Sequence, residues 1–370
     1  MVNGLARIRV VVASLSPLFG ATVTVLGVFS QVRVGIRCDV GPTRGIGHVM
    51  RSLALAEELR GRGAELVFVC DSHTVPWAND QILARDIPVE PAVWTPQDHL
   101  DLFARLELDA VVFDSYDLDA DVFTAVRQCG LPTLAIVDGE LRGAEADVFV
   151  DQNLGSELDQ PDLPAGAVRL AGLDYVLLRD EVIALRPAEP PVPGPGGVPE
   201  IFAFFGGTDA FGAGPYVVAA LAATGVPFNA TVVAPGEDLA KAIGEVPLGT
   251  GQHVEVIGPT SQLAAAVVAS DLAVSASGTS TWELLCLGVT AGLVCVVDNQ
   301  VMGYERAVAT GAAVGVGVLS DLKADPTGAA AALRPLLTDP VERARVAAAG
   351  WKLVDGLGRA RVADALYQLL

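Results

Sequence analysis

Short runs of apolar, mostly β-branched residues alternate with amphipathic stretches along the chain from Val32 onward. The apolar runs predict strands, and the stretches between them predict helices with one apolar face. In the first half, the predicted strands are 32–37, 65–70, 109–114, 132–138 and 146–152, and the predicted helices are 47–62, 77–85 and 119–129. Continuous apolar runs are typical of strands covered on both faces, and strand-helix-strand repeats are joined by right-handed crossovers. The pattern therefore predicts a doubly wound parallel sheet over residues 32–185.

A segment rich in proline and glycine interrupts this pattern over residues 186–199, and we interpret it as a linker. A second alternating run follows, with predicted strands at 201–205, 230–234, 253–257, 272–276, 293–297 and 313–318, and helices near 327–336 and 341–353 and up to Leu370. The length of 370 residues suffices for two domains, each with its own core. We expect an N-terminal α/β domain over 32–185 and a C-terminal one over 200–370, with a cleft between them. The pattern leaves open whether the last helix packs on the first domain.

The first 31 residues do not follow the alternating pattern. Two arginines precede an apolar stretch over residues 10–30 that is similar to a signal or membrane segment. Pro17 and Gly20 interrupt this stretch, so an N-terminal extension without a structural role fits as well as all membrane interpretations together. Membrane association is expected only if residues 10–30 form a real segment.

The composition narrows the possible partners. A formal charge of −20 argues against nucleic acid, because phosphate backbones are bound by basic surfaces. An anionic ligand then needs a local positive site, which helix N-termini and loop amides can supply. We interpret the five scattered cysteines as reduced core thiols of a cytoplasmic protein, and the lack of a CxxC pair or a close-spaced cluster of His and Cys gives a metal site no support. The oligomeric state stays open.

Two loops of the first half follow predicted strands, and ligands of parallel sheets bind beyond the carboxyl ends of strands. The first loop carries Gly45 and Gly47 and places His48 at a helix start, where the helix dipole favours the neutral ring that a general base needs. Its glycine spacing matches neither the dinucleotide nor the P-loop pattern. The second loop holds Asp114 and Tyr116, and the tyrosine is a candidate to hydrogen-bond a sugar or a reacting water. A capping or packing role for His48 and a packing role for Tyr116 are the alternatives.

Three loops of the second half carry glycines, hydroxyls and amides. Candidate residues are Gly206, Gly207, Thr208 and Asp209 in the first loop, Ser277, Gly278, Thr279, Ser280 and then Glu283 in the second, and Asn299 and Gln300 in the third. In the second loop, hydroxyls, a glycine and a helix N-terminus come together, which suits a diphosphate. Glu283 could accept hydrogen bonds from ribose hydroxyls, or be a first-turn glutamate favoured by the helix dipole. Asn299 and Gln300 could hold sugar hydroxyls, or belong to a helix cap.

Several motifs occur in an order that is more specific than any one of them. They are RCDVGPTRGIGHVMR (37–51), DSY (114–116), DQNL (151–154), LDYVLLRDE (173–181), GGTD (206–209), SGTSTWE (277–283) and DNQ (298–300). Through them, about residues 32–317 resemble the enzymes that hydrolyse UDP-2,4-diacetamido-2,4,6-trideoxy-β-L-altropyranose and the related spore coat polysaccharide biosynthesis proteins, which are regarded as glycosyltransferases.

The resemblance implies a GT-B fold like that of the lipid II N-acetylglucosaminyltransferase, no metal or other cofactor, and a nucleotide held mainly by the C-terminal domain. It implies that His48 activates the water that attacks the anomeric carbon and releases UDP, with Tyr116 and Asn299 as further active-site positions. Glu283 matches the residue expected to hold the ribose. The other substrate contacts that it implies are Asp39, Gly45, Gly47, Arg51, Asp114, Gly206, Gly207, Thr208, Asp209, Ser277, Gly278, Thr279, Ser280 and Gln300.

Two positions depart from the family pattern. The chain reads VDGE at 137–140 where these hydrolases often have a second Asp, and Thr290 replaces a proline common after LGV. The sugar can therefore differ. We expect a nucleotide-sugar hydrolase, with UDP as the nucleotide, in the synthesis of a surface polysaccharide or a nonulosonic-acid type sugar. The alternatives are a glycosyltransferase, in which His48 deprotonates an acceptor hydroxyl, and a non-catalytic nucleotide-sugar binding protein.

Overall fold

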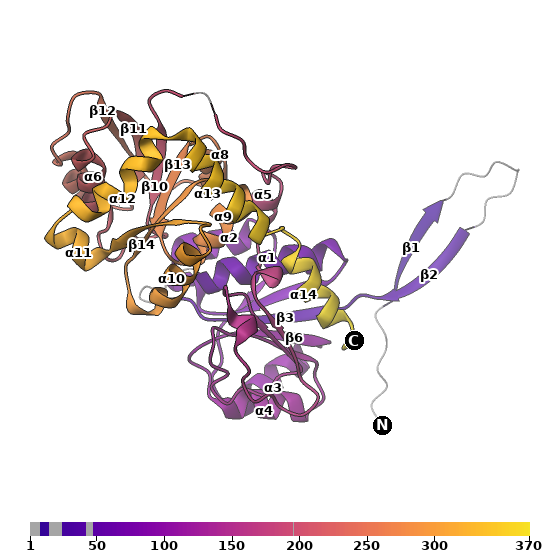
Figure 1. Cartoon of the computed structure of the whole chain (residues 1–370). Helices are drawn as coiled ribbons and strands as arrows, with labels where there is room; N and C mark the ends of the chain where they lie inside the picture. The colour runs from indigo at the N-terminus through magenta and orange to yellow at the C-terminus, as the bar shows by residue number, and fades with distance from the viewer. Residues whose placement is uncertain (1–7, 15–23, 42–46, 195) are drawn as a thin grey trace, which may run out of the picture.

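A computed structural model of the chain describes residues 8–14, 24–41, 47–194 and 196–370 (Figure 1). Most of them form two α/β domains, each built around a parallel sheet. The N-terminal sheet has seven strands in the order β5-β4-β3-β6-β7-β8-β9, and the C-terminal sheet has six in the order β12-β11-β10-β13-β14-β15. In both sheets the chain starts near the centre and reverses direction across it, as in doubly wound folds. The predicted fold class is confirmed.

The N-terminal domain alternates strands and helices as predicted. Its strands are β3 (Arg33–Cys38), β4 (Glu65–Val69), β5 (Val89–Glu90), β6 (Ala110–Asp114), β7 (Thr133–Ile136), β8 (Val148–Asp151) and β9 (Val168–Ala171). Its helices are α1 (Gly47–Gly61), α2 (Pro76–Leu83), α3 (Pro96–Arg105), α4 (Ala120–Gln128) and α5 (Asp180–Ile183), with short 3₁₀ turns η1 (Ser72–Thr74), η2 (Ser156–Leu158) and η3 (Leu173–Tyr175). The pattern missed α3, which begins at the cap Thr95, whose side chain accepts a hydrogen bond from the amide of Asp98.

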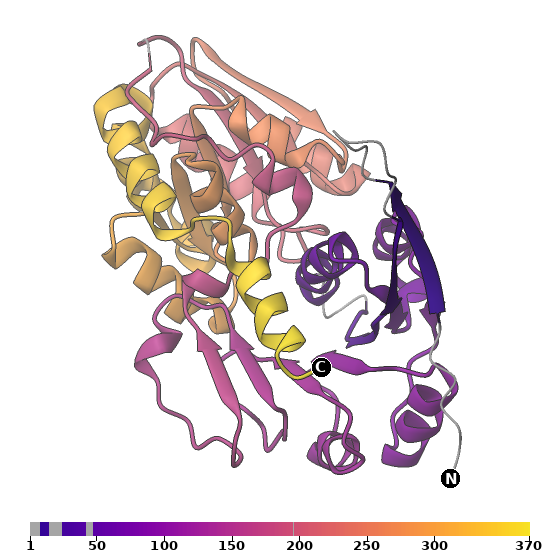
Figure 2. The same cartoon turned by 90° about the vertical axis from the view of Figure 1, so that its right-hand side faces the viewer.

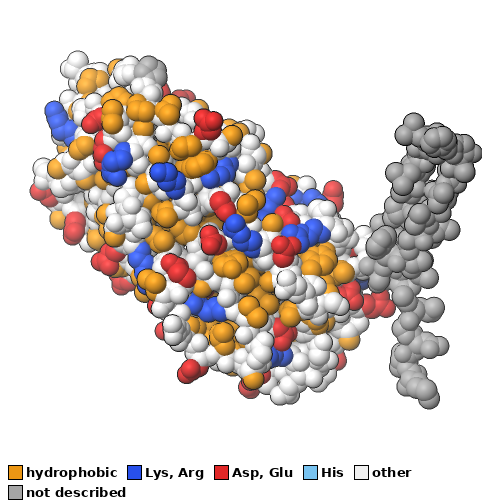
Figure 3. Space-filling view, turned by 45° about the vertical axis from the view of Figure 1, so that its right-hand side comes forward, with side chains coloured by type: hydrophobic (Ala, Val, Ile, Leu, Met, Phe, Trp, Pro, Cys, Tyr) orange, Lys and Arg blue, Asp and Glu red, His pale blue; other side chains and the backbone are white. Residues whose placement is uncertain are grey.

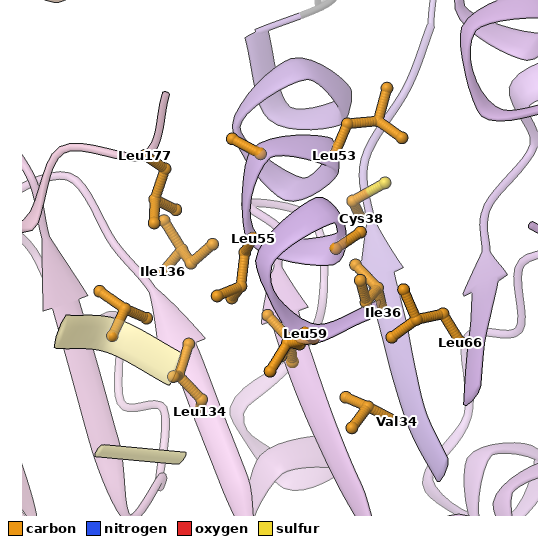
Figure 4. Packing of buried hydrophobic residues seen from close by; sticks show 14 of the residues in the cluster. Val34, Ile36, Cys38, Leu53, Leu55, Leu59, Leu66, Leu134, Ile136 and Leu177 are labelled. Carbon is orange, nitrogen blue, oxygen red and sulfur yellow. The ribbon is translucent and has the colours of Figure 1, made fainter. Parts of the chain in front are cut away.

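Both faces of the N-terminal sheet are buried, which explains its continuous apolar strands. On one face, alternate residues of β3 pack against α1, where Leu53, Leu55 and Leu59 are fully buried (Figure 4). On the other face, α3 and α4 cover a second cluster that contains Val69 and Phe113. The packing of α1 on the sheet holds its N-terminus, and with it His48, beyond the carboxyl end of β3.

The C-terminal domain repeats the same architecture. Its strands are β10 (Glu200–Phe204), β11 (Phe228–Val233), β12 (Gln252–Ile257), β13 (Leu272–Ala276), β14 (Ala291–Cys295) and β15 (Val314–Val318). Its helices are α6 (Gly214–Ala223), α7 (Glu237–Gly244), α8 (Leu263–Val268), α9 (Ser280–Leu287), α10 (Val301–Ala309), α11 (Leu319–Ala324), α12 (Thr327–Thr338) and α13 (Pro340–Leu353), with the 3₁₀ turn η4 (Asp298–Gln300). No helix or strand lies between α5 and β10 among the described residues of the predicted linker.

The last helix, α14 (Gly358–Tyr367), packs on the N-terminal domain, which answers a question that the sequence pattern left open (Figure 2). Its Val362 and Leu366 are buried in the same cluster as the residues of α1. Gly358 touches the backbone of η3 so closely that a Cβ there would lie 2.3 Å from the carbonyl oxygen of Val176. The chain therefore returns to the first domain after completing the second.

The N-terminal extension forms an antiparallel pair of strands, β1 (Ile8–Ser14) and β2 (Thr24–Ser30). They pair only with each other in the described part of the chain, and Figure 1 shows them extending away from both domains. Among the described residues, no helix has the length and apolar character needed to span a membrane.

The five cysteines differ in their exposure. Four cysteines are free and buried, whereas Cys129 is exposed, which corrects its interpretation as a core thiol. Cys129 ends α4, where the chain turns at the surface toward β7.

On the face shown in Figure 3, Lys and Arg side chains lie among acidic and apolar ones instead of forming one basic patch.

Candidate active site

Loops that follow the carboxyl ends of strands in the two sheets meet at the domain boundary. Gly47, at the start of α1, lies beside the loop before α9: a Cβ on Gly47 would be 3.7 Å from Oγ1 of Thr279. Further along the boundary, Arg306 of α10 donates a hydrogen bond of 2.8 Å to the carbonyl oxygen of Leu154, which follows β8. The folds of the two domains thus bring together loops that are more than 150 residues apart in the sequence.

His48 is held by a buried carboxylate. Its Nδ1 lies 2.5 Å from Oδ1 of Asp114, which ends β6 and is fully buried. An ionised carboxylate can only accept a hydrogen bond, so Nδ1 of His48 carries the proton that it shares with Asp114. In the neutral ring, Nε2 then has a free lone pair. This arrangement of histidine and aspartate is one that prepares an imidazole to act as a general base.

Arg51 keeps Asp114 ionised. Its Nε and Nη2 donate to the two carboxylate oxygens of Asp114, at 2.7 and 2.6 Å, and Ser52 adds a weaker contact at 3.3 Å. Burial alone would raise the pKa of Asp114, but the charges of Arg51 and His48 hold it well below its usual range. Both oxygens of Asp114 are occupied by side chains of this protein, so the geometry fits a residue that positions His48 rather than one that contacts the substrate.

Asp138, which the sequence analysis noted only as part of VDGE (137–140), belongs to the candidate site. It follows β7 and accepts hydrogen bonds from Nη1 of Arg51, at 2.9 Å, and from Nδ2 of Asn153, at 2.7 Å. Burial would raise its pKa, but Arg51 and these hydrogen bonds lower it. Arg51 thus joins two carboxylates, which bind most of its guanidinium. Its contact with the substrate stays a prediction.

Tyr116 lies beside His48 but donates its hydroxyl to Asp138. The two rings meet edge to face with centroids 4.6 Å apart, and the guanidinium carbon of Arg142 lies 4.0 Å from the centroid of the tyrosine ring. Burial and the neighbouring charge of Asp138 raise the pKa of Tyr116 well above its usual range. Tyr116 is therefore a neutral phenol that packs against the ring of His48.

Asp39 anchors the loop that carries Tyr116. Its Oδ2 accepts a hydrogen bond of 2.7 Å from the amide of Tyr116, and its Oδ1 accepts one of 2.8 Å from Oγ of Ser115. Asp39 is also buried. Both of its carboxylate oxygens, like those of Asp114, therefore accept hydrogen bonds from groups of this protein. Gly45, predicted from the same motif, lies outside the described residues.

The loop before α9 carries the hydroxyls that were predicted to bind a diphosphate. Ser277 is buried, Gly278 and Ser280 are half-buried, and Thr279 is exposed. Thr279 is the N-cap of α9, and its side chain does not cap the helix. The amides of Thr281 and Trp282 donate to the carbonyl oxygens of Gly278 and Thr279, at 3.0 and 3.2 Å. Gly278 faces Gln300, because a Cβ on Gly278 would lie 3.6 Å from Nε2 of Gln300. The predicted second and third loops of this domain are therefore neighbours.

Glu283 is paired with an arginine of the other domain. Its Oε1 accepts a hydrogen bond of 2.9 Å from Nη2 of Arg179, which precedes α5. Arg179 also pairs with Glu181. Glu283 therefore lies at the domain boundary, where the sequence pattern expected it, and Arg179 is a neighbour that the pattern could not reveal.

The remaining predicted residues divide into exposed and structural ones. Gly206, Gly207 and Thr208 are exposed after β10, and Asn299 is exposed on η4. Asp209, in contrast, is buried and accepts hydrogen bonds from the amides of Ala213 and Gly214, at 2.8 and 3.0 Å. It holds the turn into α6, and both of its carboxylate oxygens accept hydrogen bonds within the protein.

Comparison with known proteins defines the fold. Neither the family models nor the curated protein sequences give a match. Among solved structures, MurG of Acinetobacter baumannii is similar with a TM-score of 0.68 and 17% identity, over 91% of this chain and 99% of that chain. A glycosyltransferase from Rickettsia africae has a TM-score of 0.60 and 12% identity, over 92% and 99% of the two chains. MnaA of S. aureus, solved with UDP, has a TM-score of 0.60 and 11% identity, over 92% and 98%.

These similarities extend over nearly the whole length of each chain, both domains included. At such low identities they establish architecture rather than activity. The protein therefore has a GT-B-like fold of two parallel-sheet domains, with its candidate site at their boundary.

Proposed function

We propose that this protein is a nucleotide-sugar hydrolase that uses His48 as its general base and UDP as the preferred nucleotide. The observation that carries the proposal is the pairing of His48 with the fully buried Asp114 at the domain boundary. A protein that only binds nucleotide sugars has no need of a carboxylate that orients an imidazole, and Arg51 holds that carboxylate ionised.

In the proposed reaction, water attacks the anomeric carbon while Nε2 of His48 accepts a proton from it. A bond forms between the water oxygen and the anomeric carbon, and the bond from that carbon to the β-phosphate oxygen breaks. UDP leaves with the bonding electrons, and the sugar leaves with the new hydroxyl. Asp114 stabilises the imidazolium that forms, because the negative carboxylate lies 2.5 Å from Nδ1.

The C-terminal domain supplies the nucleotide site in this proposal. The hydroxyls of Ser277, Thr279 and Ser280 would bind the diphosphate at the start of α9, and the positive end of this helix suits the leaving group. Glu283 would accept hydrogen bonds from the ribose. MnaA of S. aureus, which shares the fold, was solved with UDP, and this supports UDP as the nucleotide.

A glycosyltransferase is the second candidate, because MurG and the Rickettsia africae enzyme share this fold and the same base could deprotonate an acceptor hydroxyl. The motif resemblance to the altropyranose hydrolases favours water. Under either candidate, the product belongs to the synthesis of a surface polysaccharide or a related sugar.

The test incubates the protein with UDP-, GDP- and CMP-sugars in ¹⁸O-labelled water with EDTA and without an acceptor. The hydrolase predicts nucleotide release with one ¹⁸O atom in the sugar and none in the nucleotide. Label in the nucleotide would show attack at phosphorus and contradict the mechanism. Release that begins only after an acceptor is added would replace hydrolysis by transfer.

A further inference from the structure

A fully buried arginine next to the proposed site has partners for only part of its guanidinium. Arg37 lies on β3 between Val69 of β4 and Phe113 of β6, with which it is in register, and it is 1% exposed. Its Nη1 donates to the carbonyl oxygen of Cys38, at 2.9 Å, and to Oδ1 of Asp39, at 3.3 Å. Its Nε and Nη2 are buried and have no hydrogen-bond partner among the described residues. Such groups are costly to leave unpaired, so they require an explanation.

The two unpaired nitrogens lie on the same edge of the guanidinium. The Nε and Nη2 hydrogens point in parallel, in the geometry that binds both oxygens of a carboxylate or two oxygens of a phosphate. The neighbours of Arg37 on this face of the sheet are largely apolar, and they include Val69 and Phe113. A doubly charged phosphate would lose more hydration there than a singly charged carboxylate, so this edge favours a carboxylate.

Trp94 covers Arg37, and His99 packs against Phe113, the residue of β6 that is in register with Arg37. The indole of Trp94, which follows β5, lies over the guanidinium with 4.8 Å between Cζ and the ring centroid, and Trp94 is 50% exposed. His99 of α3 is fully buried, and its Nδ1 donates to the carbonyl oxygen of Thr95 at 2.9 Å, while its Nε2 has no partner among the described residues. Burial, and then the charge of Arg37, lower the pKa of His99, so the ring is neutral and Nε2 is an acceptor.

We propose that Arg37, covered by Trp94, binds the carboxylate of a sugar acid. Two donors on Arg37 and one acceptor on His99 match a carboxylate with a neighbouring hydroxyl, which is the pattern of a uronic acid. Trp94 is the exposed side of this site, and a ligand enters by displacing the indole from the guanidinium. This proposal rests on the proposed function and deepens it. It assigns an acidic group to the sugar of the nucleotide sugar or to an acceptor.

The site is connected to the base through the residues that hold it. Arg37 donates to Oδ1 of Asp39, and Oδ2 of the same carboxylate accepts the amide of Tyr116, whose ring packs against His48. A ligand on Arg37 would therefore lie next to the loop that orders the base. A specificity site in this position can recognise a sugar without adding a charged group to the reacting centre.

The test measures binding by calorimetry of UDP, UDP-glucose, UDP-glucuronate, free glucuronate and free glucose. Wild-type protein is expected to bind UDP-glucuronate at least tenfold more tightly than UDP-glucose, if the carboxylate belongs to the donor. If it belongs to an acceptor, free glucuronate binds at least tenfold more tightly than free glucose. In Arg37→Lys, which keeps the charge but loses the two-pronged edge, either preference should fall below twofold while UDP affinity is unchanged.

A second measurement does not depend on how well the arginine variant folds. The tryptophan fluorescence of wild-type protein should change on saturation with the preferred glucuronate ligand, and this change should be lost in Trp94→Phe. Equal binding of acidic and neutral ligands in both pairs, or a preference that survives in folded Arg37→Lys, overturns the inference. If UDP binds but no acidic ligand is preferred, the inference fails alone. If UDP and the UDP-sugars do not bind, the proposed function fails, and the free glucuronate comparison still decides the inference.

Discussion

The pairing of Asp114 with His48 predicts a specific effect of the conservative change Asp114→Asn. The carboxylate accepts the proton-bearing Nδ1 of His48 at 2.5 Å, and its second oxygen is held by Arg51 at 2.7 Å. An amide of the same shape can bind Arg51 through its oxygen and then present its NH₂ group to Nδ1. This moves the ring proton to Nε2, where the lone pair is needed. The variant therefore loses the base, and it also loses the bond from Nη2 of Arg51 to Oδ1, because an NH₂ group in that place cannot accept a hydrogen bond.

The size of the effect follows from what a positioned base contributes. General-base catalysis is worth about 10²–10⁴ in rate, so kcat should fall by that factor, or by about 2.7–5.5 kcal/mol in barrier height. The affinity for UDP should change less than threefold, because the proposed nucleotide site lies in the other domain. Removing one partner of a buried ion pair also costs about 3–5 kcal/mol of stability, so thermal unfolding must be recorded and the assay run well below the midpoint.

The assay follows nucleotide release by the wild-type and variant proteins on whichever sugar the panel identifies. Asp121→Asn is the matched control, because Asp121 is an exposed carboxylate on α4, and this variant should retain full activity. If folded Asp114→Asn retains more than a tenth of the wild-type kcat, the buried carboxylate does not prepare the base and the reasoning is refuted.

Three further predictions test other parts of the account. Glu283→Ala should weaken UDP binding by about 1–3 kcal/mol in calorimetry. Glu181→Gln removes the other carboxylate that pairs with Arg179 and should leave UDP binding unchanged. Equal losses of UDP affinity in the two variants would assign the effect to Arg179 instead of the ribose. Arg51 lowers the pKa values of Asp114 and Asp138 against the effect of burial. Their contribution to stability is therefore present above an unfolded pKa of about 3.9 and is lost as pH falls through the folded values, so the urea concentration at the unfolding midpoint should decrease once the pH is below about 4. A smaller decrease in Asp138→Asn would confirm the source, whereas an unchanged decrease would exclude Asp138. Gly358→Ala should lower the thermal unfolding midpoint and make α14 sensitive to proteolysis, because a Cβ there would be 2.3 Å from the carbonyl oxygen of Val176. The control Gly328→Ala, at an exposed position of α12 with free space, should stabilise the protein by up to about 1 kcal/mol. A Gly358→Ala variant with unchanged midpoint and protease resistance would contradict the close packing.

The sequence pattern was sufficient to predict what depends on local order. Buried strands are continuous apolar runs, so the strands that end at Cys38, Asp114 and Ala276 were predicted within a residue or two, and with them the loops that carry His48 and Thr279. The position of His48 at a helix start was also predictable, because the apolar periodicity of α1 begins there.

What the pattern missed depends on contacts between distant segments. Asp138 is one of many aspartates that follow a strand, and only the fold shows that Arg51, 87 residues away, binds it. Asp209 was a candidate ligand residue because it follows two glycines, yet it caps the turn into α6. The helix α14, close to the end of the chain, packs on α1, which belongs to the first domain. Local periodicity shows that a helix has an apolar face but not which surface that face will cover.

The central claim is that His48 is the base of a nucleotide-sugar enzyme, and His48→Gln tests it most directly when turnover and UDP binding are measured on the same protein. Glutamine can still donate a hydrogen bond to Asp114 but cannot take up a proton. We predict that nucleotide release falls by at least about 10², the lower limit for a general base, while UDP binds within threefold of the wild-type affinity. Nucleotide release by His48→Gln within tenfold of the wild-type rate would contradict the account.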